Sequence, residues 1–151
     1  MIKRSTGLAV AATLLLAGTA DAKSTEYLGS FKGQPEARIG IFVKTDSKGV
    51  PKKVSLISYG GGSLKLPCSN PAGVSFPADP TSYQDLKLKK AGKSFSFAAE
   101  GEESAVNTRS IEGKIAGSGK KVTGTIDHEM DFGGSVCAVN DLRFVAKRKK
   151  D

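Results

Sequence analysis

Metal-ligating side chains are scarce in this chain of 151 residues, which has two Cys, one His and no Trp. These numbers are too small for a Cys₄ or Cys₂His₂ zinc site, an iron–sulfur centre or a three-His metal centre. The absence of Trp also removes the largest aromatic platform for stacking against sugars. The composition therefore excludes several classes of metalloprotein, while its 38% hydrophobic residues are sufficient for a folded core.

Long hydrophobic runs are also missing. The one apolar stretch, residues 8–17, is shorter than the roughly 18 residues that a membrane-spanning helix needs. The basic pair Lys3–Arg4 precedes it, and Ala20 and Ala22 follow with the spacing of a signal-peptidase cleavage site. We therefore predict a signal peptide over residues 1–22, no membrane span in the mature chain, and a secreted, periplasmic or cell-envelope location.

The two cysteines, Cys68 and Cys137, carry no C-x-x-C motif and have no neighbouring His that would activate a thiol. In an exported protein such a pair persists as a disulfide. We predict a structural disulfide between them, with two free buried cysteines as the alternative.

Period-two alternation of apolar and polar residues dominates residues 23–151. Ile39, Ile41 and Val43 alternate with polar or small residues, and other short runs repeat the pattern between Gly-rich turns such as residues 117–120. No window shows the spacing of an amphipathic helix. The sequence therefore predicts an all-β fold in one domain over 23–151: an antiparallel β-sandwich or a partly open barrel of about eight short strands.

The segment 60–80 is different because it is rich in Gly and Pro and contains Cys68. Proline cannot donate a hydrogen bond to a strand ladder, so the segment predicts a long irregular connection or a sheet edge. We expect the disulfide to attach it to the penultimate strand. Such a connection either carries function or closes one end of the sheet.

The densest group of potential metal ligands is Asp127, His128, Glu129 and Asp131. We expect this segment to form an exposed hairpin loop, where three carboxylates and an imidazole would suit a divalent cation. A divalent-metal-binding protein or a metal-dependent hydrolase is therefore the alternative function. The competing interpretation is a solvated acidic loop.

Evidence for an enzyme is weak. His128 is the only imidazole, and no G-x-S-x-G motif marks a nucleophile. The clustered Glu100, Glu102 and Glu103 leave a carboxylate pair for glycoside hydrolysis open. Residues 117–121 lack the first Gly and the Ser or Thr of a phosphate-binding loop. We therefore expect a non-enzymatic protein without a resident cofactor, a divalent metal being the one candidate.

Basic charge is abundant: the chain has 23 Lys and Arg against 15 Asp and Glu, a formal net charge of +8. A net +7 remains in residues 23–151 once Lys3, Arg4 and Asp21 are set aside. Most of these residues are lysines, which attract anions without bidentate selectivity. The predicted anion-binding residues are Lys87, Lys89, Lys90, Lys120 and Lys121. Solubility and protection of edge strands are the alternative roles.

Outside a cell, the dense anions are envelope polymers, acidic polysaccharides and lipid headgroups. We therefore expect an exported β-module that associates with an anionic envelope polymer or acidic polysaccharide through lysine-rich faces. Nucleic acid is less available there. Base stacking requires aromatic side chains interleaved with the basic positions, and the alternation places Phe95, Phe97 and Phe144 on inward faces and leaves Phe42, Tyr27, Tyr59 and Tyr83 as the candidates for exposure.

The C-terminal part also carries a resemblance. An Ile-x-Gly-x-Ile strand at 111–115 leads to the hairpin 119–125, then to Gly133-Gly134, Cys137 and a final strand at 144–148. This pattern resembles small secreted bacterial β-sandwich proteins. The resemblance implies a sandwich and brings no catalytic residue with it.

Overall fold

The structure is a computed structural model that describes residues 23–60, 62–104 and 107–151, with the side chains of 102–104 left aside. The predicted signal peptide, residues 1–22, lies outside the described residues. Within the described ranges there is no helix that could cross a membrane.

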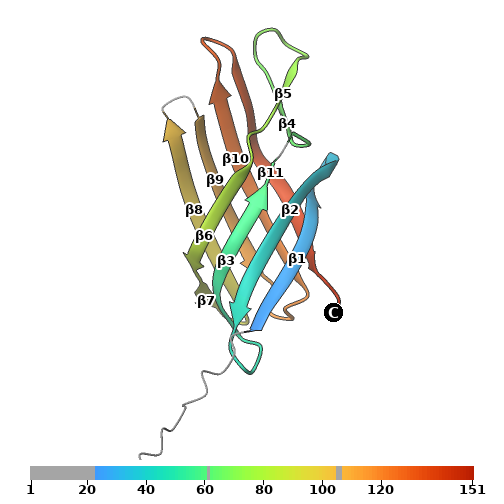
Figure 1. The fold of residues 1–151 in the computed structure, drawn as a ribbon, viewed down its shortest axis with the longest axis vertical. Helices are drawn as coiled ribbons and strands as arrows, with labels where there is room; N and C mark the ends of the chain where they lie inside the picture. The colour runs from blue at the N-terminus through green and yellow to red at the C-terminus, as the bar shows by residue number, and fades with distance from the viewer. Residues whose placement is uncertain (1–22, 61, 105–106) are drawn as a thin grey trace, which may run out of the picture.

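Nine strands form one antiparallel sheet in the order β6-β3-β2-β1-β11-β10-β9-β8-β7, and β4 and β5 form a small second sheet (Figure 1). The strands of the described chain are β1 (Lys23–Phe31), β2 (Gln34–Thr45), β3 (Pro51–Tyr59), β4 (Lys65–Pro67), β5 (Ser75–Pro77), β6 (Thr81–Lys87), β7 (Lys89–Ala91), β8 (Ser94–Ser104), β9 (Asn107–Ile115), β10 (Lys121–Asp131) and β11 (Val136–Arg148). The all-β, antiparallel prediction is confirmed.

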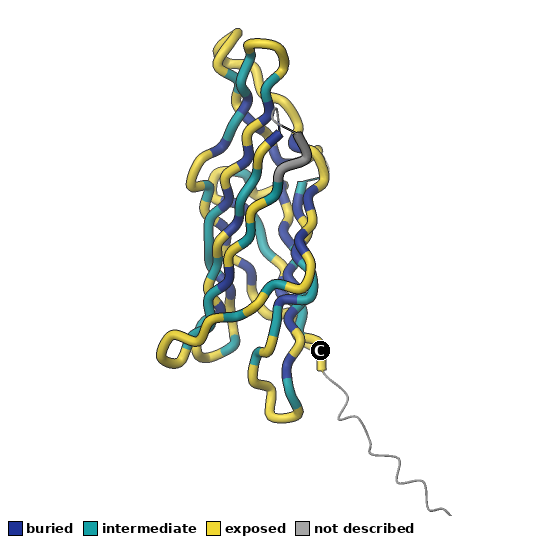
Figure 2. The backbone as a smooth tube through the Cα atoms, turned by 90° about the vertical axis from the view of Figure 1, so that its left-hand side faces the viewer, coloured by how far each residue is buried: buried dark blue, intermediate teal, exposed yellow. Residues whose placement is uncertain are grey.

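The large sheet curls until its two edges approach each other, without closing into a barrel. β6 and β7 stand at opposite ends of the strand order, yet only Leu88 separates them in the chain. Buried residues alternate with more exposed ones along the strands, as the alternating colours of the backbone in Figure 2 show. Ile39, Ile41 and Val43 are at most 1% exposed. Of the two predicted architectures, the curled single sheet corresponds to the partly open barrel.

The strands are longer than the sequence pattern predicted. β10 has 11 residues and β11 has 13, and they pair from Lys121–Lys147 to Asp131–Val136. The prediction of a hairpin loop at 127–131 is therefore wrong, because these residues are the last five of β10. Their acidic side chains did not mark a turn: the turn follows at 132–135, where Gly133 and Gly134 have positive φ.

The segment 60–80 contains the β4–β5 hairpin. Cys68 and Cys137 form the predicted disulfide, with their Cα atoms 3.9 Å apart, and the Ser69 amide donates to the Val136 carbonyl. Cys137 belongs to β11, so the hairpin is attached to the last strand and not to the penultimate one. Leu64 and Leu66 are fully buried, which shows that this segment covers the upper part of the core.

Candidate functional site

The lower end of the molecule in Figure 1 contains the β2–β3, β7–β8 and β9–β10 turns. The beginning of β1 and the end of β11 lie there as well. The Tyr27 hydroxyl donates to the Gly119 carbonyl at 2.9 Å and so ties β1 to the β9–β10 turn. A Cβ atom on Gly117 would lie 2.7 Å from the Lys93 Cβ, so the absence of a side chain lets the β7–β8 and β9–β10 turns touch. These contacts hold the turns together as one surface.

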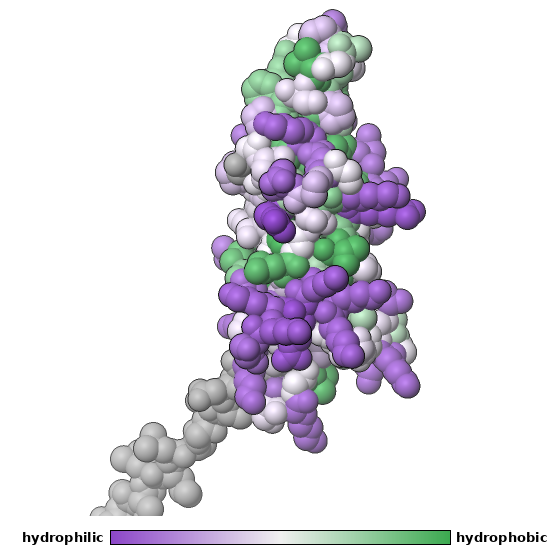
Figure 3. Space-filling model, turned by 90° about the vertical axis from the view of Figure 1, so that its right-hand side faces the viewer, coloured by the Kyte–Doolittle hydropathy of each residue, from purple (hydrophilic) through white to green (hydrophobic). Residues whose placement is uncertain are grey.

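We call this surface the basic end and define it by residues 23–26, 44–53, 87–93, 114–121 and 147–151. It carries 16 of the 21 Lys and Arg of residues 23–151 and only three of the 14 acidic residues, a net charge of +13. The rest of residues 23–151 carries five basic and 11 acidic residues, a net charge of −6. Figure 3 shows hydrophilic side chains crowded over the lower part of one face. The charge is therefore segregated along the long axis.

The five lysines predicted from the sequence all lie at the basic end, and all are exposed. Lys89 and Lys90 belong to β7, and Lys87 ends β6. Lys120 lies in the β9–β10 turn, where its carbonyl accepts from the Arg148 amide, and Lys121 pairs with Lys147 across β10 and β11. Hairpin pairing thus brings together basic residues that are far apart in the sequence.

Some of this charge is compensated locally. Lys53 forms an ion pair with Asp85, and the resulting hydrogen bond lowers the pKa of the Asp85 carboxyl. Lys52 pairs with Asp46 at 3.1 Å and Lys149 with Glu26 at 3.0 Å. These pairs are exposed and contribute little to stability. In the part of the chain that the structure describes, Lys52, Lys53 and Lys149 are the lysines of the basic end in ion pairs, so most of its lysines are available to a ligand.

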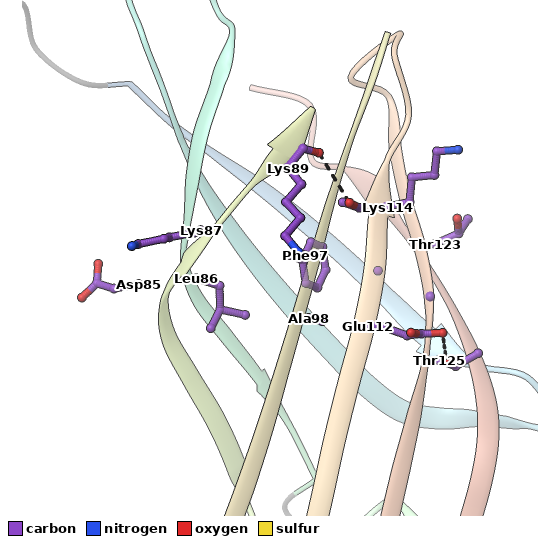
Figure 4. A pocket seen from close by; sticks show the side chains of 13 residues that line it. Asp85, Leu86, Lys87, Lys89, Phe97, Ala98, Glu112, Lys114, Thr123 and Thr125 are labelled. Atoms are coloured by element: carbon purple, nitrogen blue, oxygen red, sulfur yellow. Dashed lines mark hydrogen bonds between the residues drawn. The ribbon is translucent and has the colours of Figure 1, made fainter. Parts of the chain in front are cut away.

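A hollow of about 700 Å³ adjoins the basic end, between the β6–β7 segment and the outer faces of β8, β9 and β10. We call it the lateral hollow. Two cross-strand rows form its floor and far side, Ser96–Lys114–Thr123 and Ala98–Glu112–Thr125. Figure 4 shows Asp85, Leu86 and Lys87 on one side of the hollow and Glu112, Lys114, Thr123 and Thr125 on the other.

The polar groups in the lateral hollow are of two kinds. Lys87, Lys89 and Lys114 contribute ammonium groups, while Ser96, Thr123 and Thr125 contribute hydroxyls. Thr125 Oγ1 donates to Glu112 Oε1 at 3.5 Å, and Ser96 Oγ donates to the Lys89 carbonyl at 3.4 Å. Phe97, Gly113 and Gly124 form a third cross-strand row between these two. Phe97 is buried and the other two residues are glycines, so no side chain of this row projects into the hollow.

The predicted metal ligands do not converge. Asp127 and Glu129 are on the outer face of β10, whereas His128 is fully buried on the inner face. Asp131 accepts from the Gly134 amide at 3.1 Å and so stabilises the β10–β11 turn. Among the described residues, no group of three or more His, Cys, Asp or Glu could hold a metal ion. Successive side chains of a strand point to opposite faces of the sheet, so the imidazole and the carboxylates lie on different faces. The prediction of a loop did not include this alternation.

Asp127 has a structural role instead. Its Oδ1 accepts from the Asp141 amide at 2.7 Å, and its Oδ2 accepts from Ser110 at 3.2 Å. The first contact lies beside the irregularity in the β10–β11 ladder between Ile126 and His128, and Asp141 has φ +50°. Asp127 thus supports a bulge. Glu100 is exposed on β8, and the side chains of Glu102 and Glu103 lie outside the description, so the structure adds no catalytic geometry there.

A group of polar side chains lies inside the curled sheet near its upper end. The His128 ring contacts the Tyr59 ring edge-on with centroids 6.2 Å apart, and Tyr59 packs against Tyr83 at 6.5 Å. Arg109 on β9 donates to the hydroxyl of Thr81 on the edge strand β6 at 3.1 Å. Burial raises the pKa of Tyr59 far above its ordinary value, and the neighbouring Tyr83 adds to the effect. This group joins β6 to β9 across the open edge.

Tyr59 makes the stability of the protein sensitive to alkaline pH. Its pKa is raised in the folded state, so its contribution is present below pH 10 and is lost as the unfolded chain releases the proton above that value. We expect the free energy of unfolding to fall by about 1.4 kcal/mol per pH unit for this group above pH 10. Urea unfolding at pH 8, 10 and 11 measures this slope. Tyr59→Phe should have the shallower slope, and parallel slopes would refute the assignment.

Several groups of the lateral hollow were missed by the sequence analysis: Ser96, Lys114, Thr123 and Thr125. None belongs to a motif, and Ser96 and Thr123 are 27 residues apart in the chain. The signal that could have found them is the pairing of the β8–β9 and β9–β10 hairpins, which places outward residues in common rows.

Comparison of the chain with family models, curated proteins and solved structures found no match.

Proposed function

We propose that this protein is an exported, non-enzymatic module that binds an anionic envelope polymer or acidic polysaccharide through its basic end. The observation that carries the proposal is the segregation of charge, +13 at the basic end against −6 elsewhere. A polyanion that approached this end would meet lysines from five separate segments at once. Attraction of this kind raises both the rate of encounter and the affinity, and salt weakens it.

The segregation of charge also favours this proposal over a role in solubility alone. A soluble surface needs charges of both signs distributed over it, and a single-sign region is the exception. Here 11 of the 14 acidic residues occupy the remainder of the molecule, including Glu100, Asp127 and Glu129 on the outer face of the upper sheet. The resulting electrical asymmetry would orient the molecule with its basic end toward a polyanion.

The disulfide supports the exported location, because such bonds persist in oxidising compartments. We infer that residues 1–22 direct export, and that the mature protein meets its polymer outside the cytoplasm. Mass spectrometry of the protein from the medium or periplasm tests this step, and a mature N-terminus at Lys23 is the expected result.

Two matched double variants test the polymer site. Lys120→Gln with Lys121→Gln removes two charges from the basic end, and Lys32→Gln with Lys65→Gln removes two exposed charges from the rest of the surface. Binding to dextran sulfate and to linear polyphosphate is measured by titration at several salt concentrations. We expect the first pair to weaken both interactions by about tenfold at low salt, and the second pair to change them little. Equal losses in the two pairs, or no binding by the wild type, would contradict the proposal.

A further inference from the structure

We infer that the lateral hollow is a saccharide subsite, and that the polymer bound at the basic end carries carboxylate groups on sugar units. This inference rests on the proposed function and names the class of ligand for the same surface. The hollow of about 700 Å³ has the size of a small-molecule site and could hold a short segment of a sugar chain.

The chemistry of the hollow differs from that of the surrounding surface. The ammonium groups of the basic end recognise negative charge of any kind. The hollow adds three side-chain hydroxyls, those of Ser96, Thr123 and Thr125, next to the ammonium groups of Lys87, Lys89 and Lys114. Ser96 and Thr125 already donate within the protein and can accept from a sugar hydroxyl, whereas the Thr123 hydroxyl can both donate and accept. A ligand that carries hydroxyls and carboxylates would satisfy both sets.

The geometry keeps these groups in place. Lys114 lies between Ser96 and Thr123 in one cross-strand row, and Glu112 lies between Ala98 and Thr125 in the next. The side chains of both rows stand on β8, β9 and β10, which are neighbouring strands of one sheet. Binding groups on paired strands are positioned more rigidly than groups on loops, which reduces the entropy lost on binding.

The two carboxylates of the hollow also favour a sugar over a simple polyanion. Asp85 is neutralised by Lys53, whereas Glu112 is exposed and accepts a hydrogen bond from Thr125. A dense polyphosphate chain would be repelled by Glu112, and it carries no hydroxyl that could donate to that carboxylate. A sugar hydroxyl can donate to the same carboxylate. The hollow therefore favours an anion that also carries hydroxyl groups.

The test uses an oligogalacturonate, in which every sugar unit carries a carboxylate, and linear polyphosphate, which has no sugar. Thr123→Val with Thr125→Val removes two hydroxyls from the hollow at nearly constant shape and unchanged net charge. Thr108→Val is the matched control, because Thr108 is an exposed threonine on β9 outside the lateral hollow. The dissociation constants are measured by calorimetry at a fixed, moderate salt concentration. Thr123→Val alone serves as a second variant in case the double variant unfolds.

We expect the double variant to bind oligogalacturonate about tenfold more weakly, the loss that two ordinary hydrogen bonds would produce. Its affinity for polyphosphate should be unchanged, and Thr108→Val should behave as the wild type with both ligands. If the double variant retains full affinity for oligogalacturonate, or loses affinity equally for both ligands, the saccharide subsite is refuted while the polymer-binding proposal stands. If the wild type binds neither ligand, the proposed function itself fails.

Discussion

Reduction of the Cys68–Cys137 disulfide should lower the free energy of unfolding by about 4 kcal/mol. The bond joins residues 69 positions apart, and the chain-entropy model gives this magnitude for a closed loop of that length. The loop contains β5 to β10, and five of these six strands belong to the nine-stranded sheet, so the constraint acts on more than half of that sheet. Urea unfolding followed by far-ultraviolet circular dichroism, with and without reductant, measures the difference.

The reduced wild-type protein isolates the covalent link, because both sulfur atoms remain in place. Cys68→Ala with Cys137→Ala should lose at least as much stability, since Cys137 is 1% exposed and its replacement also removes buried atoms. Coincident unfolding curves for the oxidised and reduced forms would show that the attachment of the β4–β5 hairpin does not stabilise the sheet.

Gly124→Ala should destabilise the protein by about 3 kcal/mol or more, or prevent folding. A Cβ atom at this position would lie 2.6 Å from Phe144 Cζ and would clash with the Glu112 carbonyl oxygen. The backbone oxygen belongs to the β9–β10 ladder and cannot move aside without breaking it. The strain of such overpacking typically costs about 1–3 kcal/mol, and displacement of the ladder adds to it. Thermal and urea unfolding both report the loss.

Gly40→Ala is the matched control for Gly124→Ala, because Gly40 is also an interior strand glycine. Its added Cβ atom would have the Ser58 hydroxyl as its nearest neighbour at 3.5 Å, an ordinary contact. We expect this variant to unfold at the wild-type urea concentration or slightly above it, since Ala has less freedom than Gly in the unfolded chain. A similar loss of stability in both variants would show that the close contact at Gly124 is not the cause.

Much of the fold could be predicted from the sequence because β-structure leaves a period-two pattern. Ile39, Ile41 and Val43 alternate as expected, and all three are buried. The disulfide could be predicted because the chain has two cysteines, which form one possible pair. Strand length was harder to predict: the run Asp127–Asp131 combines hydrophilic residues with a buried His128, so its polarity suggested a turn although its alternation continued the strand.

The candidate site could be predicted only in part. The excess of lysine is visible in the sequence, and all five named lysines are at the basic end. Their gathering at one end depends on strand direction, because every second turn of an antiparallel sheet lies at the same end. The lateral hollow depends on register: Ser96, Lys114 and Thr123 become neighbours only when β8, β9 and β10 pair without a slip. Neither property is encoded in any local motif.

Lysine acetylation mapped by mass spectrometry, in the absence and presence of dextran sulfate, tests the central claim most directly. It reports separately on each exposed lysine of the native protein. Binding through the basic end predicts that the polymer slows the acetylation of Lys90, Lys93, Lys120 and Lys121 severalfold and leaves Lys32 and Lys65 unchanged. Equal protection of all six lysines, or protection of none, would contradict the account.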